Sequence, residues 1–504
     1  MEPNAGKPNP WKNTLIRSLC FAVLVSILRF AYVVTVRGGS CDSGDFCFFS
    51  EPLKLAGSIA LIRPSSAVSG GDDPLRDLQT SKRYRATVDY YASVFQDLIS
   101  EGYLSPDSKA LCVGTPAGQD VVALKEIGVR DSIGISKKAS PPLVVSGHAF
   151  RQPFDENTFD FEFSAFGALD RSAQPVDFAA EVGRTLKPGG FFVAHTVAAK
   201  DAYSFNSFLD LFNCCRLIRR RDIVNPDPSA PAVREIVMKK EIAILGSSPR
   251  AKPVSKCHVP GYKRDIIRNA EQLFDEEPLK PWITLKRNIK NIKYLPSMVD
   301  INFKQRYVYI DIGARNYGSS IGSWFKKQYP KQNKTFEVYA VEADKAFHEE
   351  YALKKGVTLL PYAAWVKNET LFFEIRRDPS QKLEEKGRRG MGRIQTVQSS
   401  ASFIGDVDKI QGFDFAVWLK SVVSEKDFVV VKMDVEGTEF HLIPRLIETG
   451  AICLIDEMFL ECHYNRWQRC CPGKRSPKYQ KTYAQCLDLF SSLRERGVLV
   501  HQWW

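Results

Sequence analysis

The stretch FVVVKMDVEGTE, residues 428–439, decides the fold of the C-terminal half of the chain. It begins with a short apolar run, which is typical of a strand buried on both faces of a sheet. This strand delivers Asp434 and Glu436 to its carboxyl end, where Gly437 and the start of a helix follow. Ligands of doubly wound sheets bind outside the carboxyl ends of the strands. We therefore expect the two carboxylates at a ligand-binding edge.

A second pattern of strand, loop and helix lies upstream in YIDIGARNYG, residues 309–318. The strand ends in Asp311 and runs into a loop that contains Gly313 and Gly318. Glycine permits a tight turn and a close approach of the backbone to a ligand. The next strand ends in Glu342, and an acid there can accept hydrogen bonds from both hydroxyls of a ribose. This pattern alone is compatible with NAD, a flavin or S-adenosylmethionine (SAM).

Short apolar strands alternate with helical patterns over residues 109–198 and again from residue 307 to the C-terminus. Such alternation predicts a parallel sheet that helices cover on both faces. The sequence thus predicts an α/β fold with two tandem Rossmann-like units that are not close repeats of each other. The predicted domains are 81–245 for the first unit, 246–300 for a linker with packing helices, and 301–504 for the second unit.

The C-terminal motifs together resemble those of a known family. The string K-x-D-V-E-G-x-E at 432–439, with the upstream D-I-G-A loop and V-E-A, resembles the FkbM-type SAM-dependent methyltransferases. The segment FLECHY, with Glu461 and His463, is similar to the E-x-H of that family at the end of the next core strand. The resemblance covers roughly residues 300–465, and it implies a seven-stranded class I methyltransferase fold with S-adenosyl-L-methionine as cofactor.

The resemblance also implies where this cofactor binds. Asp311, Gly313 and Gly318 would surround the methionyl part of SAM, and Glu342 would bind the ribose. The methyl group on the sulfonium must be held in line with a nucleophile, so positioning supplies most of the rate.

Three residues are the candidates for catalysis: Asp434, Glu436 and His463. Asp434 and Glu436 would lie at the reaction centre, and a sugar hydroxyl is a poor nucleophile that benefits from a general base within hydrogen-bonding reach. The structural alternative is that Asp434 caps the following helix and that His463 is a core histidine with its hydrogen bonds satisfied. No metal site is predicted.

The first unit also resembles a class I methyltransferase, through Leu186-Lys-Pro-Gly-Gly190 between a helix and a strand. Its cofactor positions differ from the pattern, because Cys112 stands where an acid should end the first strand, Ser136 stands at the ribose position and His148 stands near the adenine position. Neutral groups hold ribose hydroxyls less strongly than a carboxylate does. We therefore interpret this unit as degenerate and non-catalytic.

The N-terminal segment Ser18–Val36 is apolar except for Arg29 and is about as long as a bilayer-spanning helix. The excess of basic residues lies before it, which predicts a cytosolic tail over 1–17 and a lumenal remainder. A stem rich in Gly, Ser and Pro follows over 37–80. These features predict a signal-anchor and a single-pass type II protein of the Golgi apparatus or another secretory-pathway membrane, and a cleaved signal peptide is the alternative. The whole arrangement also resembles plant membrane proteins of unassigned activity.

The composition is that of a globular protein, with 504 residues, 44% hydrophobic and 25% charged residues, and a net charge of +12. It excludes a disordered chain, a collagen-like chain and a polytopic membrane protein. Of the twelve cysteines, several cluster in the C-terminal region. Disulfides and buried free thiols are both compatible with this clustering.

The leading hypothesis is a SAM-dependent O-methyltransferase that acts on a sugar or glycan hydroxyl in the secretory lumen. The alternative is a catalytically inactive methyltransferase-like scaffold or a glycan-binding protein. The expected partners are a glycan or small-molecule acceptor, a membrane through the N-terminal helix, and possible partner glycosyltransferases. No nucleic acid is expected.

Overall fold

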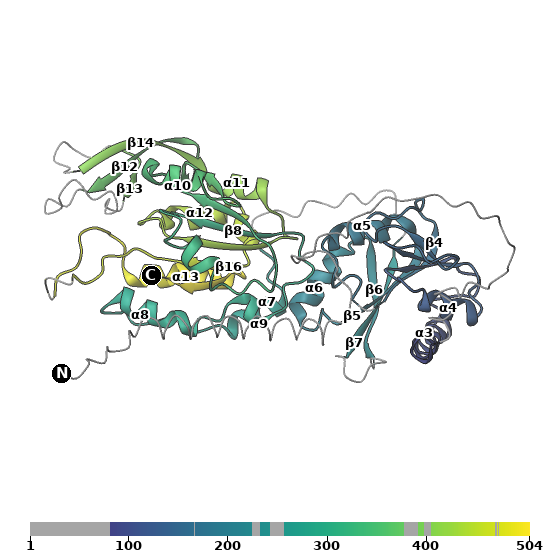
Figure 1. The fold of residues 1–504 in the computed structure, drawn as a ribbon. Helices are drawn as coiled ribbons and strands as arrows, with labels where there is room; N and C mark the ends of the chain where they lie inside the picture. The colour runs from purple at the N-terminus through teal and green to yellow at the C-terminus, as the bar shows by residue number, and fades with distance from the viewer. Residues whose placement is uncertain are drawn as a thin grey trace, which may run out of the picture. The chain divides into compact units, whose positions relative to one another are not determined.

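The computed structural model describes residues 81–165, 167–223, 232–241, 257–376, 392–397, 405–468, 471 and 473–503 (Figure 1). The predicted tail, anchor and stem at residues 1–80 lie outside these residues. The described chain forms three sheets, of seven, six and four strands.

The first sheet has seven strands in the order β3-β2-β1-β4-β5-β7-β6. All neighbours pair in parallel except β7, which runs antiparallel to both β5 and β6. The strands are β1 (Ala110–Val113), β2 (Ser132–Ser136), β3 (Val144–Ser146), β4 (Phe159–Ser164), β5 (Leu186–Thr196), β6 (Cys215–Ile223) and β7 (Val233–Lys240). This mixed sheet confirms a Rossmann-like methyltransferase fold for this part of the chain.

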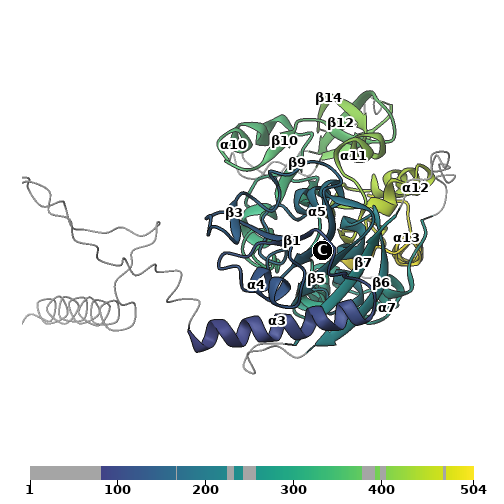
Figure 2. The same cartoon turned by 90° about the vertical axis from the view of Figure 1, so that its right-hand side faces the viewer.

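Helices cover both faces of this sheet because its strands are apolar on both sides. Cys112 of β1 lies in the core formed with α3 (Lys82–Ser100) and α4 (Gln119–Glu126). The flanking residues Leu111 and Val113 lie in the opposite core, formed with α5 (Pro175–Thr185) and α6 (Ala202–Leu211). Figure 2 shows α3 and α4 on one side of the sheet and α5 on the other.

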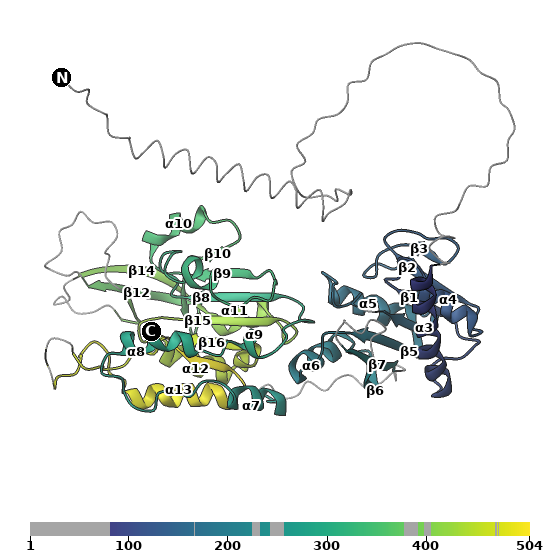
Figure 3. The same cartoon turned by 60° about the horizontal axis from the view of Figure 1, so that its bottom comes forward.

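The second sheet has six parallel strands in the order β10-β9-β8-β15-β16-β17 (Figure 3). They are β8 (Tyr307–Ile312), β9 (Glu337–Val341), β10 (Thr358–Leu360), β15 (Phe428–Met433), β16 (Glu457–Leu460) and β17 (Leu499–Gln502). The chain builds outward from β8 to β10 and then returns to β15 beside β8, so the strand order reverses between β8 and β15. The prediction of seven strands in this sheet is wrong for the described residues, because the edge beyond β17 has no antiparallel strand.

Helices cover both faces of the second sheet as well. The face with Val429 and Val431 packs on α11 (Phe415–Val422), α12 (Glu439–Glu448), η4 (Ala451–Leu454) and α13 (Tyr483–Glu495). The face with Phe428 and Val430 packs on α7 (Gly261–Arg268), η1 (Ile289–Asn291), α9 (Leu295–Met298), the π-helical turn η2 (Ile321–Phe325), η3 (Lys345–Phe347) and α10 (His348–Ala352). A further helix, α8 (Pro281–Asn288), lies between α7 and η1 in the chain.

A four-stranded sheet is inserted between β10 and β15, with the order β11-β14-β12-β13. Its strands are β11 (Ala363–Trp365), β12 (Glu369–Arg376), β13 (Gly392–Gln395) and β14 (Gly405–Asp414). Leu371, Phe373 and Ile375 alternate inward from β12 and form a small core of their own with Trp365. This sheet was not predicted from the sequence.

Among the helices of the described ranges, none is both long and apolar enough to cross a membrane. The longest is α3, whose 19 residues alternate a buried apolar face with exposed charges such as Lys82, Arg83 and Arg85. This finding contradicts the prediction of a membrane protein with a transmembrane signal-anchor and a location in the Golgi or another secretory membrane. The anchor proposed at residues 18–36 itself lies outside the described residues.

The loops after β8 and β15 touch through their backbones. The Asp434 N–H, after β15, donates to the carbonyl of Ile312, the last residue of β8. The Gly313 N–H donates to the carbonyl of Val341, the last residue of β9. Gly313 has a φ of +78°, and a Cβ at this position would overlap the Asp434 carbonyl oxygen. The close approach of these two loops therefore requires glycine at 313.

We predict that Gly313→Ala destabilises the C-terminal part strongly. The left-handed φ costs an alanine about 1–2 kcal/mol, and displacing a backbone carbonyl adds roughly 3 kcal/mol or more. Gly356→Ala is the matched control, because Gly356 has a φ of +72° but open space around the new Cβ. Urea unfolding followed by tryptophan fluorescence measures both variants, and equal losses of stability would contradict the steric argument.

Candidate active site

A cavity lies at the carboxyl edge of the second sheet, where the strand order reverses. Gly313, Glu342, Asp434 and Glu436 line it from the ends of β8, β9 and β15. The loop after β10 and the four-stranded sheet complete the wall with Tyr362, Ala363, Ala364, Phe373, Gly392 and Ile394. Four of the residues that the sequence analysis selected thus lie around one cavity, and the inserted sheet closes part of it.

Glu342 lies at the end of β9 with both carboxylate oxygens engaged by backbone. The Arg315 N–H donates to Oε2 and the Asp344 N–H donates to Oε1, each over 2.6 Å. The residue is 7% exposed. Burial raises the pKa of Glu342 to about 7, although both N–H donors favour the carboxylate. Each oxygen keeps a further lone pair for a ligand hydroxyl.

Asp311 does not line the cavity but lies beneath it, fully buried. Its carboxylate accepts hydrogen bonds from the Ser320 hydroxyl and, over 3.3 Å, from Nζ of Lys432. Burial alone would lower the pKa of Lys432, but the charges of Asp311 and Asp434 outweigh it and raise the pKa. Lys432 is the first residue of the K-x-D-V-E-G-x-E string. Only its position opposite Asp311 in the sheet shows that it is the partner of this buried acid.

Two other predicted residues lie outside the cavity wall. Gly318 is exposed in the loop between β8 and η2. His463, after β16, lines a neighbouring hollow with Glu461, Tyr479 and Trp503. The predicted contact of Gly318 with the methionyl group of SAM stays a prediction.

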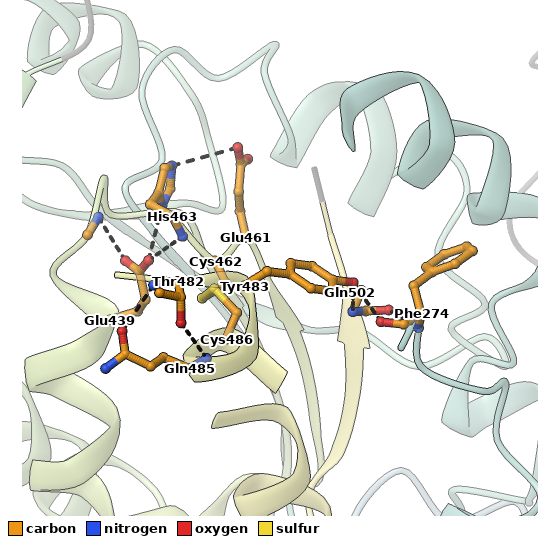
Figure 4. The surroundings of a disulfide bond; sticks show 11 residues. Phe274, Glu439, Glu461, Cys462, His463, Thr482, Tyr483, Gln485, Cys486 and Gln502 are labelled. Atoms are coloured by element: carbon orange, nitrogen blue, oxygen red, sulfur yellow. Dashed lines mark hydrogen bonds and ion pairs between the residues drawn. A yellow bond between two sulfur atoms is a disulfide. The ribbon is translucent and has the colours of Figure 1, made fainter. Parts of the chain in front are cut away.

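His463 nevertheless lies close to the predicted acids. Its Nε2 is 3.6 Å from Oδ1 of Asp434, 3.7 Å from Oε1 of Glu461 and 3.9 Å from Oε2 of Glu436. Its Nδ1 is 3.2 Å from Oε1 of Glu439 (Figure 4). The structure therefore brings the three candidate catalytic residues together at the ends of β15 and β16.

The charges of this cluster shift its pKa values. Burial alone would lower the pKa of His463, but the surrounding carboxylates, Glu439 first, raise it to about 10. Burial raises the pKa of Asp434, and it raises the pKa of Glu461 to about 7. Burial would also raise the pKa of Glu436, but His463 and Lys478 outweigh it and lower that pKa.

The structure also bears on the structural alternatives. Helix α12 has Thr438 as its N-cap and shows no side-chain capping bond, so Asp434 does not cap it. His463 is a core histidine in part, since it is 5% exposed and paired with Glu439 through Nδ1. Its Nε2 faces the acids that border the cavity.

Two contacts to Glu436 had no signal in the sequence. Nζ of Lys478 donates to Oε2 of Glu436 over 2.6 Å, and the Tyr479 hydroxyl donates to the same oxygen. Both donors lie in the loop before α13, far from Glu436 along the chain. Only the tertiary structure brings them to the site.

A disulfide fixes the segment that carries His463. Cys462 is bonded to Cys486 of α13 (Figure 4), and Cys257 is bonded to Cys453. Free thiols occur at Cys112, Cys214 and Cys215, outside the C-terminal region. Of the clustered cysteines, Cys453, Cys462 and Cys486 form disulfides. Because Cys462 lies between Glu461 and His463, its bond to α13 limits the movement of both side chains.

The first sheet places its predicted positions differently. Cys112 is fully buried, and a Cβ at Gly114 would lie 2.7 Å from Cβ of Ala168. Asp120, which the sequence analysis missed, is buried in the first turn of α4 and accepts a 2.6 Å hydrogen bond from the Thr115 hydroxyl. Burial raises the pKa of Asp120 to about 6. That this unit is non-catalytic stays a prediction.

Family models match both parts of the chain. Residues 116–194 match the model described as a methyltransferase domain. Residues 267–371 and 389–504 match a domain of unknown function, DUF7870. The search of curated proteins found no match.

Solved structures resemble about a third of the chain. A complex that contains the Trm112 methyltransferase activator of Haloferax volcanii is 15% identical, with 34% of this chain and 100% of that chain covered and a TM-score of 0.27. A SAM-dependent methyltransferase of Thermotoga maritima is 16% identical (33% and 98% covered, TM-score 0.24). The 1,6-didemethyltoxoflavin-N1-methyltransferase of Burkholderia thailandensis, solved with S-adenosylhomocysteine, is 14% identical (33% and 82% covered, TM-score 0.27). At these TM-scores the likenesses carry no argument.

The family match confirms the predictions of a methyltransferase and of its cofactor, and it does so in the unit interpreted as degenerate. The FkbM resemblance of the C-terminal part stays a prediction. Residues 116–194 of the chain are similar to a methyltransferase domain.

Proposed function

We propose that the C-terminal sheet is a second, catalytic methyltransferase unit of the FkbM type. It would transfer a methyl group from SAM to a hydroxyl of a sugar or glycan acceptor. The observation that carries the proposal is that Glu342 and Asp434 line one cavity, on either side of the Gly313 loop.

The residues present fit this cofactor. Gly313 lines the cavity without a side chain that could project into it, and Glu342 presents a carboxylate at the end of the strand next to β8. Phe347 and Tyr362 add aromatic surface to the wall, which suits a planar base. When bound there, SAM supplies an electrophilic methyl group on a sulfonium.

The chain's own residues would prepare the acceptor. Asp434 lines the cavity and makes no side-chain hydrogen bond among the described residues, and its raised pKa makes it a stronger base than an ordinary aspartate. His463, positively charged at neutral pH, would stabilise the Asp434 carboxylate from the other side. Asp434 is therefore the proposed general base, with Glu436 and His463 as positioning residues.

The sugar or glycan acceptor rests on the resemblance of the DVEGTE string to the FkbM-type enzymes. The competing proposal is a scaffold or glycan-binding protein that has kept the fold and lost turnover. Binding of SAM by the C-terminal part separates the two.

We predict that Glu342→Gln weakens SAM binding by the full-length chain about tenfold to a hundredfold. The reason is the loss of charge-assisted hydrogen bonds to the ribose, each worth about 1.5–3 kcal/mol. Isothermal titration calorimetry measures the affinity. Glu349→Gln, an exposed residue of α10, is the matched control and should bind as the wild type does.

The same titration identifies which unit binds the cofactor. If SAM binds the wild type and Glu342→Gln equally well but fails to bind Ser136→Arg, the first unit holds it, and the proposal for the C-terminal sheet is wrong. If no folded variant and no wild-type chain binds SAM, the scaffold hypothesis is favoured.

We predict that SAM binding weakens as the pH falls below about 7. Glu342 has a pKa of about 7 in the free protein, so at lower pH it carries a proton that binding must remove. The dissociation constant should then rise about tenfold per pH unit between pH 7 and pH 5. Glu461 titrates in the same range, so Glu342→Gln is the necessary control. A pH dependence that survives in Glu342→Gln would assign the effect to another group.

We predict that Asp434→Asn lowers methyl transfer by about 10²–10⁴-fold while SAM affinity is unchanged, because the variant lacks the base but keeps the shape. The assay follows label from methyl-labelled SAM into a panel of oligosaccharides. Asp488→Asn, an exposed position on α13, is the matched control. Full activity in Asp434→Asn would exclude this residue as the base.

A further inference from the structure

Three metal-ligating side chains converge beside the cavity. Asp434, Glu436 and His463 each offer one ligand atom, and these atoms all lie within 4.8 Å of one another. They come from the adjacent ends of β15 and β16, which pair in parallel. A single ion between them would contact all three after shifts of a few tenths of an ångström to an ångström at each side chain.

The orientation of His463 is that of a metal ligand. Oε1 of Glu439 accepts from the His463 backbone N–H over 2.6 Å and lies 3.2 Å from Nδ1. Oε2 of Glu439 accepts from the Gly437 N–H, so this fully buried carboxylate is held on both sides. Because Nδ1–H donates to this carboxylate, Nε2 is the ring nitrogen that can bind a cation, and the cation must displace the proton that Nε2 carries in the ion-free protein.

Nε2 of His463 has no hydrogen-bond partner among the described residues. The side chain is 95% or more buried, and the three oxygens nearest to Nε2, on Asp434, Glu461 and Glu436, lie 3.6–3.9 Å away. These distances exceed a hydrogen bond but suit two ligands of one ion. This buried nitrogen faces three carboxylates without a hydrogen bond to any of them, and Figure 4 shows it directed at one of them, Glu461.

The neighbouring lysines do not balance the negative charge of the acids in the cluster. Nζ of Lys432 is 3.9 Å from Asp434 but is closer to Asp311, at 3.3 Å. Lys478 and Tyr479 donate to Oε2 of Glu436, the oxygen that lies 3.9 Å from Nε2 of His463, so an ion would bind Glu436 through a further lone pair of Oε2 or through Oε1. With Glu461 beside them, the acids outnumber the lysines at the centre of the cluster.

We propose that Asp434, Glu436 and His463 bind one divalent transition-metal cation of the Mn²⁺ type. Carboxylates suit Mn²⁺ and imidazole suits the first-row transition metals, whereas a site with a histidine ligand is a poor one for Mg²⁺ or Ca²⁺. This is a site that the sequence analysis did not predict. Its role, which rests on the proposed function, is to bind the acceptor oxygen in the cavity and lower its pKa, so that the hydroxyl gives its proton to solvent water before the methyl group is transferred, with Asp434 then a ligand instead of the base.

The test is a titration of the EDTA-treated full-length chain with Mn²⁺, in which electron paramagnetic resonance counts the free ion. We expect one Mn²⁺ site in the wild type. In Asp434→Asn we expect the affinity for Mn²⁺ to fall by at least about tenfold. The matched control Asp488→Asn should bind as the wild type does. Spin-echo modulation of the bound Mn²⁺ should show a directly coordinated imidazole nitrogen in the wild type and lose it in His463→Gln.

The wild-type measurements decide even where a variant does not fold. Absence of binding at about 1 mM Mn²⁺, the weak end of protein cation sites, would overturn the proposal. So would binding that Asp434→Asn leaves unchanged and that shows no nitrogen coupling. SAM titration of the same EDTA-treated chain distinguishes the two proposals. SAM binding without Mn²⁺ binding rejects only the metal site, and Mn²⁺ binding without SAM binding rejects only the proposed cofactor site.

Discussion

The pairing of β8 with β15 is the constraint on which the C-terminal site depends. In this register Asp311 lies directly opposite Lys432, and the last residues of the two strands bring Gly313 against Asp434. A slip by one residue would turn Lys432 toward the other face of the sheet and leave the buried Asp311 without its cation. The buried ion pair therefore fixes the register as well as the charge at the switch point.

The second determinant of the site is a group of closely spaced charges, whose electrostatic interactions are strong because the side chains are buried. Acids at the ends of β9, β15 and β16 are forced close together, and their pKa values shift in opposite directions according to their partners. Glu436 is held ionised by His463 and Lys478, whereas Glu342 titrates near neutral pH. Groups with separated pKa values in one place are typical of sites that move protons or bind cations.

The indications of function are divided between the two larger sheets. The family match to methyltransferases lies on the first sheet, where the loop after β1 packs closely on Ala168 and β1 carries a buried cysteine, Cys112. The cavity and the cluster of acids lie on the second sheet, whose family model carries no function. Chemistry on the second sheet is thus argued from its own side chains, and the fold of the first does not supply it.

The sequence by itself determined the local pattern. Apolar strands that end in Asp311, Glu342 and Asp434 predicted a parallel sheet with acids at one edge, because side chains at the carboxyl ends of parallel strands share that edge. Only the tertiary structure decided which acids face the cavity. Asp311 lies within β8 opposite Ala340 and is buried with Lys432 as its partner, whereas Glu342 follows the last residue of β9 and lines the wall.

The inserted four-stranded sheet, the contacts of Lys478 and Tyr479 with Glu436, and the setting of His463 among four carboxylates also came from the tertiary structure. Each joins segments that are distant in the chain, and local periodicity holds no information on such contacts. The six strands found where seven were expected have the same cause, since a family motif specifies the centre of a sheet and leaves its edge open.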